Sequence, residues 1–236
     1  MGTDPNADSK AEAEGKRWQK NVGQKNENSP LRSKRGDLQE DAKGTKGKRR
    51  PAKSAVKYSI SKEIHDEMYD AYEGICMYCA SWTPRTPRGG AFLQTTIDHY
   101  IPKSVSPHMA YQWSNFRLSR SDLNTRKGID LYVPDPFGIQ NNWFEIDFAT
   151  WHVRASDVAP DILKNRARSA FVRLGLNEDF YIEERQSAAA VYVHWPAERD
   201  RLSKLYPFLT AELERQTQGT DLLEELRELL PRPAQS

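Results

Sequence analysis

The sequence has little of what marks a membrane protein or a disulfide-rich one. Its 236 residues include only two cysteines, which are too few for a framework of disulfide bonds. No apolar run approaches the roughly 20 residues that cross a bilayer, and residues 1–30 lack the apolar core of a signal peptide. We therefore expect a cytoplasmic protein that has no membrane partner.

Net charge is also small, but the two signs are unevenly distributed. The whole chain has a formal charge of +2, whereas residues 1–57 hold 15 Lys and Arg against 8 Asp and Glu. That segment has almost no apolar residues, so it cannot bury enough surface to offset the entropy of ordering. We predict a disordered basic tail over residues 1–57. Its role is open between a solubilising segment, an arm that binds nucleic acid, and a nuclear localisation signal at Lys46–Pro51.

After the tail, short strand-like runs alternate with apolar residues at helical spacing, which predicts an α+β fold. The expected elements, in order, are a helix at 61–74, strands at 91–97 and 115–118, a helix from Leu123 capped by Ser121 or Asp122, extended segments at 143–148 and 150–153, and helices at 157–174, 178–190, 197–216 (bent at Pro207) and 220–230. We divide this body into a core at 58–134 and a C-terminal region at 135–236 that begins with strands and continues as helices.

Side chains suited to phosphodiester hydrolysis lie close together in the core. His99, at the end of the first strand, can take a proton from water near pH 7. Asp98 and Asn124 offer hard oxygen ligands to Mg²⁺ or another divalent cation. Neighbours on a strand point to opposite faces, so a twist or bulge is expected where Asp98 and His99 meet one phosphate. Two basic residues near the start of the helix are predicted to bind flanking phosphates: Arg126 and Lys127.

Three blocks in this stretch resemble the HNH endonuclease family, which is built on a ββα-metal finger. They read IDHYIPKS, YQWSNFRLS and LNTRKG, and they follow the family's order within residues 74–128. The resemblance implies that His99 is the general base and that Asp98 and Asn124 hold one Mg²⁺-like ion. It also implies that Asn115 braces the loop carrying His99. The segment 118–124 is similar to the HNH module of RNA-guided CRISPR nucleases as well.

Three later segments resemble bacterial HNH proteins of anti-phage defence systems, some of which work with an ATPase. They are DPF at Asp135–Phe137, WFEIDF at 143–148 and RLGLN at Arg173–Asn177. This resemblance implies that the C-terminal region docks a protein partner, such as an ATPase, or clamps the substrate. DNA is the expected substrate. RNA stays open, because no residue is identified that reads a base or a 2′-hydroxyl.

The cysteines depart from the pattern of many HNH proteins. Cys76 and Cys79 form one Cys-x-x-Cys pair, but the positions of the usual second pair hold Arg120 and Leu123. Two thiolates do not complete the tetrahedral site of a structural zinc. We therefore expect no zinc here, unless His or Asp residues from elsewhere supply ligands, and expect the cysteines to pack inside the finger.

The incomplete cysteine set and the basic tail also favour a second function. In this alternative the chain is a non-catalytic subunit that binds nucleic acid or assembles a complex, with a degenerate finger as its scaffold. Replacing His99 would then leave complex formation and biological activity intact.

Overall fold

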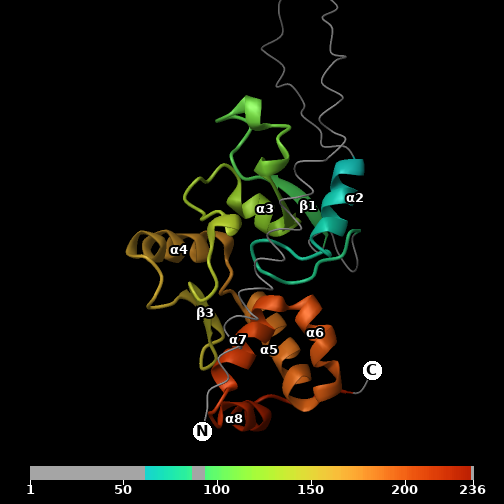
Figure 1. The fold of residues 1–236 in the computed structure, drawn as a ribbon, viewed down its shortest axis with the longest axis vertical. Coiled ribbons are helices and arrows are strands. Elements are labelled where there is room, and N and C mark those ends of the chain that lie inside the picture. Colours follow the sequence, from blue (N-terminus) through green and yellow to red (C-terminus); the bar gives the residue numbers. More distant parts are fainter. Residues whose placement is uncertain (1–61, 87–93, 235–236) are drawn as a thin grey trace, which may run out of the picture. The chain divides into compact units, whose positions relative to one another are not determined.

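The computed structural model describes residues 62–86 and 94–234. The chain divides into two units, Met1–Ser59 and Ile60–Ser236, and every described residue lies in the second. The tail predicted for residues 1–57 lies outside the described residues, as does the first part of the strand predicted at 91–97. The described part mixes helices with two small antiparallel sheets, so the α+β prediction is confirmed at that level (Figure 1).

Two antiparallel strands and the helix that follows them carry the residues predicted for the site (Figure 1). These elements are β1 (Thr95–His99), β2 (Phe116–Arg120) and α3 (Ser121–Lys127). The register runs unbroken from the pair Thr95↔Arg120 to the pair His99↔Phe116. The β-branched residues of β1 suit a pleated strand, and Gly128, with a φ of +53°, ends α3.

A first helix covers one side of this sheet. α2 (Lys62–Ala71) places Met68 and the following Tyr72 four residues apart, on one face of the helix. Both side chains pack with Phe116 and Leu118 of β2 in a small apolar cluster. Burying this face fixes α2 against the back of the strands.

The C-terminal region contains a second hairpin and five helices. They are β3 (Phe144–Asp147), β4 (His152–Ala155), α4 (Asp161–Leu174), α5 (Asp179–His194), α6 (Arg199–Leu205), α7 (Pro207–Thr217) and α8 (Leu222–Leu229). Short 3₁₀ turns occur at Pro107–Met109, Trp113–Asn115, Pro136–Gly138 and Pro196–Glu198. The predicted bend at Pro207 is the break between α6 and α7.

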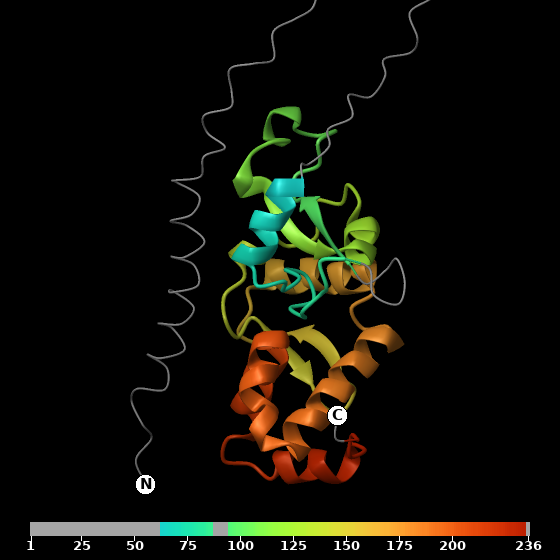
Figure 2. The same ribbon diagram turned by 90° about the vertical axis from the view of Figure 1, so that its right-hand side faces the viewer.

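Helix α4 joins the two halves of this unit. It packs against α3 on one side and against β4 on the other (Figure 2). The main hydrophobic core likewise draws Leu123 and Val133 from the first half together with Ile146 and Leu174 from the second. The boundary that we expected at residue 134 is therefore not a division of the hydrophobic core.

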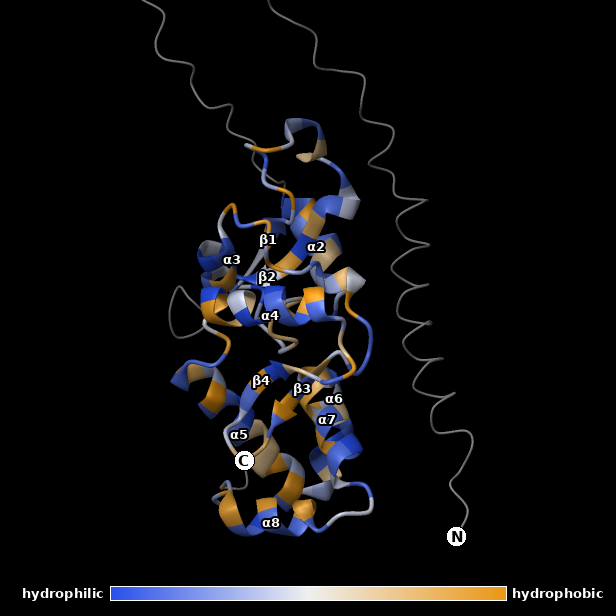
Figure 3. Ribbon diagram, turned by 90° about the vertical axis from the view of Figure 1, so that its left-hand side faces the viewer, coloured by the Kyte–Doolittle hydropathy of each residue, from blue (hydrophilic) through white to orange (hydrophobic). Residues whose placement is uncertain are grey.

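The last helices are amphipathic and close the core at its far end. On α8, hydrophilic and hydrophobic residues alternate around the helix, with Leu226 buried and Leu229 exposed (Figure 3). The apolar residues of 197–230 are therefore divided between the core, as Leu226 is, and the surface, as Leu229 is. None of the helices in the described residues is long and apolar enough to span a bilayer.

Candidate active site

An open pocket of about 400 Å³ lies at the end of β1, beside α3. Asp98, His99 and Asn124 all line it, so the structure brings together three of the residues predicted for the site. The remaining lining is Ile97, Pro102, Lys103, Ser104, Gly128 and Ile129. The register of β1 contains no bulge of the kind that we expected. The pocket lies where the strand ends, so side chains of both strand faces can reach it.

The imidazole of His99 is anchored through one of its nitrogens. Nε2 lies 2.9 Å from the carbonyl oxygen of Ala110, and the ring stands edge-on to Phe116 at 5.1 Å between centroids. A carbonyl only accepts hydrogen bonds, so Nε2 donates, and in the neutral ring Nδ1 is the unprotonated nitrogen. Burial lowers the pKa of His99, and the positive charge of Lys103 adds to this, against a smaller opposite effect of the bond to Ala110. The ring is therefore a neutral base at neutral pH.

Asn115 makes the contacts of a brace. Its side chain is 2% exposed, and Oδ1 accepts a hydrogen bond of 2.7 Å from the backbone N–H of Ile101. Nδ2 donates to the carbonyls of Ile101 at 2.9 Å and Met109 at 3.2 Å. Since Met109 directly precedes Ala110, this amide fixes the loop segment that anchors His99. Asn115 is not part of the pocket lining.

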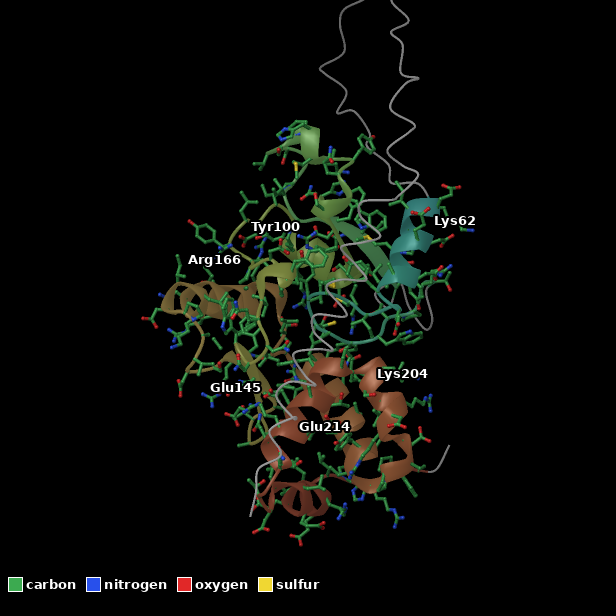
Figure 4. All side chains as sticks on the ribbon, in the orientation of Figure 1. Lys62, Tyr100, Glu145, Arg166, Lys204 and Glu214 are labelled. Atoms are coloured by element: carbon green, nitrogen blue, oxygen red, sulfur yellow. The ribbon has the colours of Figure 1, made fainter. Side chains whose placement is uncertain are left out.

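The carboxylate of Asp98 is held by two neighbouring side chains. Tyr78 donates its hydroxyl to Oδ2 at 2.5 Å, and the ammonium of Lys127 lies 3.0 Å from the same oxygen and 3.3 Å from Oδ1. Lys127 also donates to the carbonyl of Tyr100 at 3.1 Å, and the Tyr100 ring lies 5.5 Å from its nitrogen (Figure 4). Asp98 lines the pocket, and the ammonium of Lys127 already balances its negative charge.

Asn124 is oriented by its own amide nitrogen. Nδ2 donates to the hydroxyl of Thr96 at 2.7 Å and more weakly to the carbonyl of Ile97 at 3.4 Å. The carbonyl oxygen of the side chain is then the Asn124 atom suited to accept a cation. Both of its partners lie on β1, so α3 and β1 together set the direction of this amide.

The oxygen ligands in the pocket fit a Mg²⁺ ion that is held weakly and that completes its coordination with water and the substrate. This ion prefers oxygen ligands, and proteins commonly bind it through one or two carboxylates plus water and substrate phosphate. Asp98 and Asn124 supply one carboxylate and one amide oxygen in one pocket. Lys127 competes for the same carboxylate. Within the described ranges, no group of three or more His, Cys, Asp or Glu could hold a metal by itself.

The two basic residues predicted to contact phosphates are used inside the protein. Lys127 is 0% exposed because its ammonium lies on Asp98, which corrects its assignment as a surface phosphate ligand. Arg126 donates to the carboxylate of Glu178 at 2.7 Å and to the carbonyl of Leu174 at 3.1 Å. It ties α3 to the segment between α4 and α5. The spacing of charges on α3 does not reveal either partner, since both lie far away in the sequence.

Arg120 and Leu123 occupy the two positions where a second cysteine pair would complete a zinc site. The backbone N–H of Arg120 points to Sγ of Cys76 at 3.3 Å. Hydrogen bonds from Cys79 and from backbone N–H groups outweigh burial and lower the pKa of Cys76 to about 7, whereas burial raises that of Cys79. Leu123, at the other position, is a fully buried core residue. Cys76 is buried, Cys79 is partly buried, and neither forms a disulfide bond within the described residues.

The guanidinium of Arg120 forms a cross-link to α5. It is 2% exposed, donates to Glu184 at 2.9 Å and lies 3.4 Å from Asp122. The rings of Phe180 and Tyr181 lie 4.8 and 4.9 Å from it. Asp122, one of the two residues expected to cap α3, instead accepts the Tyr181 hydroxyl at 2.6 Å, and α3 begins at Ser121 without a side-chain cap.

Two contacts near the pocket were not foreseen. Tyr78 lies between the two cysteines in sequence, and only the fold brings its hydroxyl to Asp98. Arg117, opposite Asp98 in the sheet, is buried and pairs with Asp135 of the DPF segment at 2.5 Å, with the Phe137 ring 4.1 Å from the guanidinium. The DPF segment therefore closes the back of the β1–β2 sheet.

The chain matches no protein-family model, no curated protein and no solved structure.

Proposed function

We propose that this protein is an HNH-type endonuclease that uses a divalent cation to hydrolyse phosphodiester bonds of DNA. The observation that carries the proposal is the meeting of His99, Asp98 and Asn124 around one open pocket. Each of these side chains has the chemical character that its role requires: a neutral base and two oxygen donors.

The proposed reaction is direct hydrolysis. His99, held at Nε2 by Ala110, accepts a proton from water at Nδ1 while the water oxygen bonds to phosphorus and the bond to the leaving oxygen breaks. Mg²⁺, held by Asp98 and Asn124, would neutralise charge on the phosphate and the leaving oxygen. Asn115 keeps the loop around His99 in place, and Lys127 with Tyr78 keeps the Asp98 carboxylate in place.

A plasmid assay tests this function. Full-length wild type is expected to nick or linearise supercoiled DNA in Mg²⁺ and not in EDTA. His99→Ala should lower the rate by about 10²- to 10⁴-fold, the usual value of a general base. His152→Ala, which changes an exposed histidine on β4, should cut like wild type. Equal cutting by His99→Ala, or no cutting by wild type, would contradict the proposal.

The alternative of a non-catalytic subunit is favoured by one contact. Lys127 already neutralises Asp98, as an ion would otherwise do, which suits a finger retained as a scaffold. That alternative requires His99→Ala to preserve complex formation and biological activity.

A role as an effector of a bacterial defence system, with an ATPase as partner, is a further part of the proposal. Its support is the resemblance of the three C-terminal segments. Copurification from the native source tests it, and a chain that is fully active and unregulated alone would contradict it.

A further inference from the structure

The pocket needs positive charge that its own helix does not supply. A nucleic-acid substrate presents phosphates on both sides of the bond to be cut, and proteins position them with Arg and Lys. Lys127 is buried against Asp98, and Arg126 pairs with Glu178 and donates to the carbonyl of Leu174. Cations on other elements around the pocket are therefore candidates to hold these phosphates.

The RLGLN segment contains one residue that its structural role does not explain. Leu174 and Leu176 are buried in the core. Gly175, with a φ of +68°, ends α4, and Asn177 donates to and accepts from the backbone of Val153 at 3.0 and 2.8 Å. These four residues build the joint between α4 and the hairpin.

Arg173, the first residue of that segment, lies beside a residue that lines the pocket. Its Nη2 lies 3.9 Å from the position that a Cβ on Gly128 would take, and Gly128 lines the pocket. The side chain is 53% exposed and lies 3.9 Å from the carboxylate of Asp130. This is the longest arginine–carboxylate pair within the described ranges, so the guanidinium can turn toward a ligand at little cost.

Lys103 places a second cation at the same pocket from a different element. It follows β1 in the loop after His99 and lines the pocket. Its charge is near enough to contribute to the lowered pKa of His99. The two cations come from α4 and from the loop after β1, outside the turn of α3 that was expected to hold the phosphates.

We infer that Arg173, together with Lys103, binds a backbone phosphate of the nucleic-acid substrate beside the phosphodiester bond that is hydrolysed. The inference rests on the proposed function and extends it, because it gives α4, outside the ββα elements, a direct part in holding the substrate. Arg173 acts here as a phosphate-binding residue.

Binding of a labelled DNA duplex in the His99→Ala background tests the inference without cleavage. The full-length protein is measured over a range of salt concentrations in Mg²⁺, alone and with Arg173→Leu, Arg173→Lys or Arg168→Leu. Arg168 is an exposed arginine of the same helix, about 140° away around its axis. Any contribution of the tail is common to every variant and cancels.

Losing one phosphate contact should flatten the slope of log affinity against log salt by about 0.9. We expect this for Arg173→Leu, with Arg173→Lys and Arg168→Leu close to the parent. With His99 restored, kcat/KM for plasmid cleavage should fall about tenfold in Arg173→Leu, the effect of one charge-assisted contact at a partly exposed site.

Asp130→Asn separates phosphate binding from a purely structural ion pair. If Arg173 only pairs with Asp130, Arg173→Leu and Asp130→Asn should weaken DNA binding alike. If Arg173 binds a phosphate, Asp130→Asn frees it, and that variant should bind DNA at least as well as the parent. Equal slopes for Arg173→Leu and Arg168→Leu in folded proteins would overturn the inference, as would a parent that binds no DNA. Binding that responds to Arg173 without any cleavage by wild type would overturn the proposed nuclease and leave the phosphate site standing.

Discussion

The ammonium of Lys127 lies 3.0 Å from a carboxylate oxygen of Asp98, and the two side chains are only 0% and 3% exposed. One residue sits at the end of β1 and the other at the end of α3, so this buried ion pair joins the two elements that form the pocket. Breaking such a pair is costly because the remaining charge is left largely buried without its partner.

We therefore predict that Lys127→Met lowers the free energy of unfolding by about 3–5 kcal/mol. Urea denaturation followed by circular dichroism measures it. The matched control is Lys164→Met, which removes a 3.5 Å pair with the exposed Asp161 and should cost less than about 1 kcal/mol.

Adding Asp98→Asn to Lys127→Met should recover much of the loss, since it removes the uncompensated charge. A double variant that is no more stable than Lys127→Met would contradict the ion pair as the cause.

A second prediction concerns metal and the cysteines. Chelation with EDTA should leave the thermal midpoint unchanged, because Arg120 rather than zinc links this region to Glu184. Arg120→Met should lower the free energy of unfolding by about 3 kcal/mol, since it strands a largely buried carboxylate. Arg154→Met, whose pair with Glu145 is more exposed, is the control and should cost below about 1 kcal/mol. A midpoint that falls by several degrees in EDTA would point to a structural zinc.

A third prediction separates backbone strain from crowding at two glycines. Gly175 and Gly219 have φ values of +68° and +73°, and a Cβ would meet nothing within 4 Å at Gly219. At Gly175 the Cβ would lie 1.7 Å from Nη1 of Arg126. Gly219→Ala should cost about 1–2 kcal/mol from the left-handed backbone alone.

Gly175→Ala should cost up to about 1 kcal/mol more than Gly219→Ala, because the partly exposed pair of Arg126 with Glu178 must move. A Cβ at Gly175 would also lie 2.5 Å from Oε1 of Glu178, so in a background with both Arg126→Ala and Glu178→Ala the two glycine substitutions should cost the same. If their difference survives in that background, crowding by this ion pair is not its source.

A fourth prediction concerns pH. Burial lowers the pKa of His99, so the imidazole stays unprotonated, and able to accept a proton, below the ordinary histidine value of about 6.5. Activity should be present above the lowered pKa and fall up to about tenfold per pH unit below it, with the midpoint of the acid limb of kcat/KM under about 6.5.

Lys103→Met removes a charge that helps to lower this pKa, so it should move the midpoint upward whatever it does to the rate itself. A wild-type midpoint above the ordinary value, or one that Lys103→Met moves downward, would contradict His99 as the titrating base.

Much of the secondary structure could be read from local patterns. The helix at α2, the strands β3 and β4, and the break before Pro207 follow from apolar spacing, β-branched residues and the missing N–H of proline. The start of α3 was placed too late, because Ser121 and Asp122, its expected caps, lie inside the helix. Asp122 turns to Tyr181, a contact that local sequence does not encode.

The candidate site divides in the same way. Three residues were recognisable because their chemistry and order are local, and the hairpin and α3 bring Asp98, His99 and Asn124 to one pocket. Charged partners were not recognisable. Arg126 pairs with Glu178 because the fold places the start of α5 beside it. The separation of the two residues along the chain does not predict this contact.

The sequence by itself therefore determined which elements form and which side chains have the chemistry of a base and of oxygen ligands, since both follow from residue type and short-range spacing. The tertiary structure decided which charges are already paired. It buried Lys127 on Asp98, put Arg120 where a second cysteine pair was absent, and left Arg173 beside the pocket. Electrostatic pairing acts through space between residues up to 70 positions apart, as Arg215 and Glu145 are, so only the packed chain fixes it.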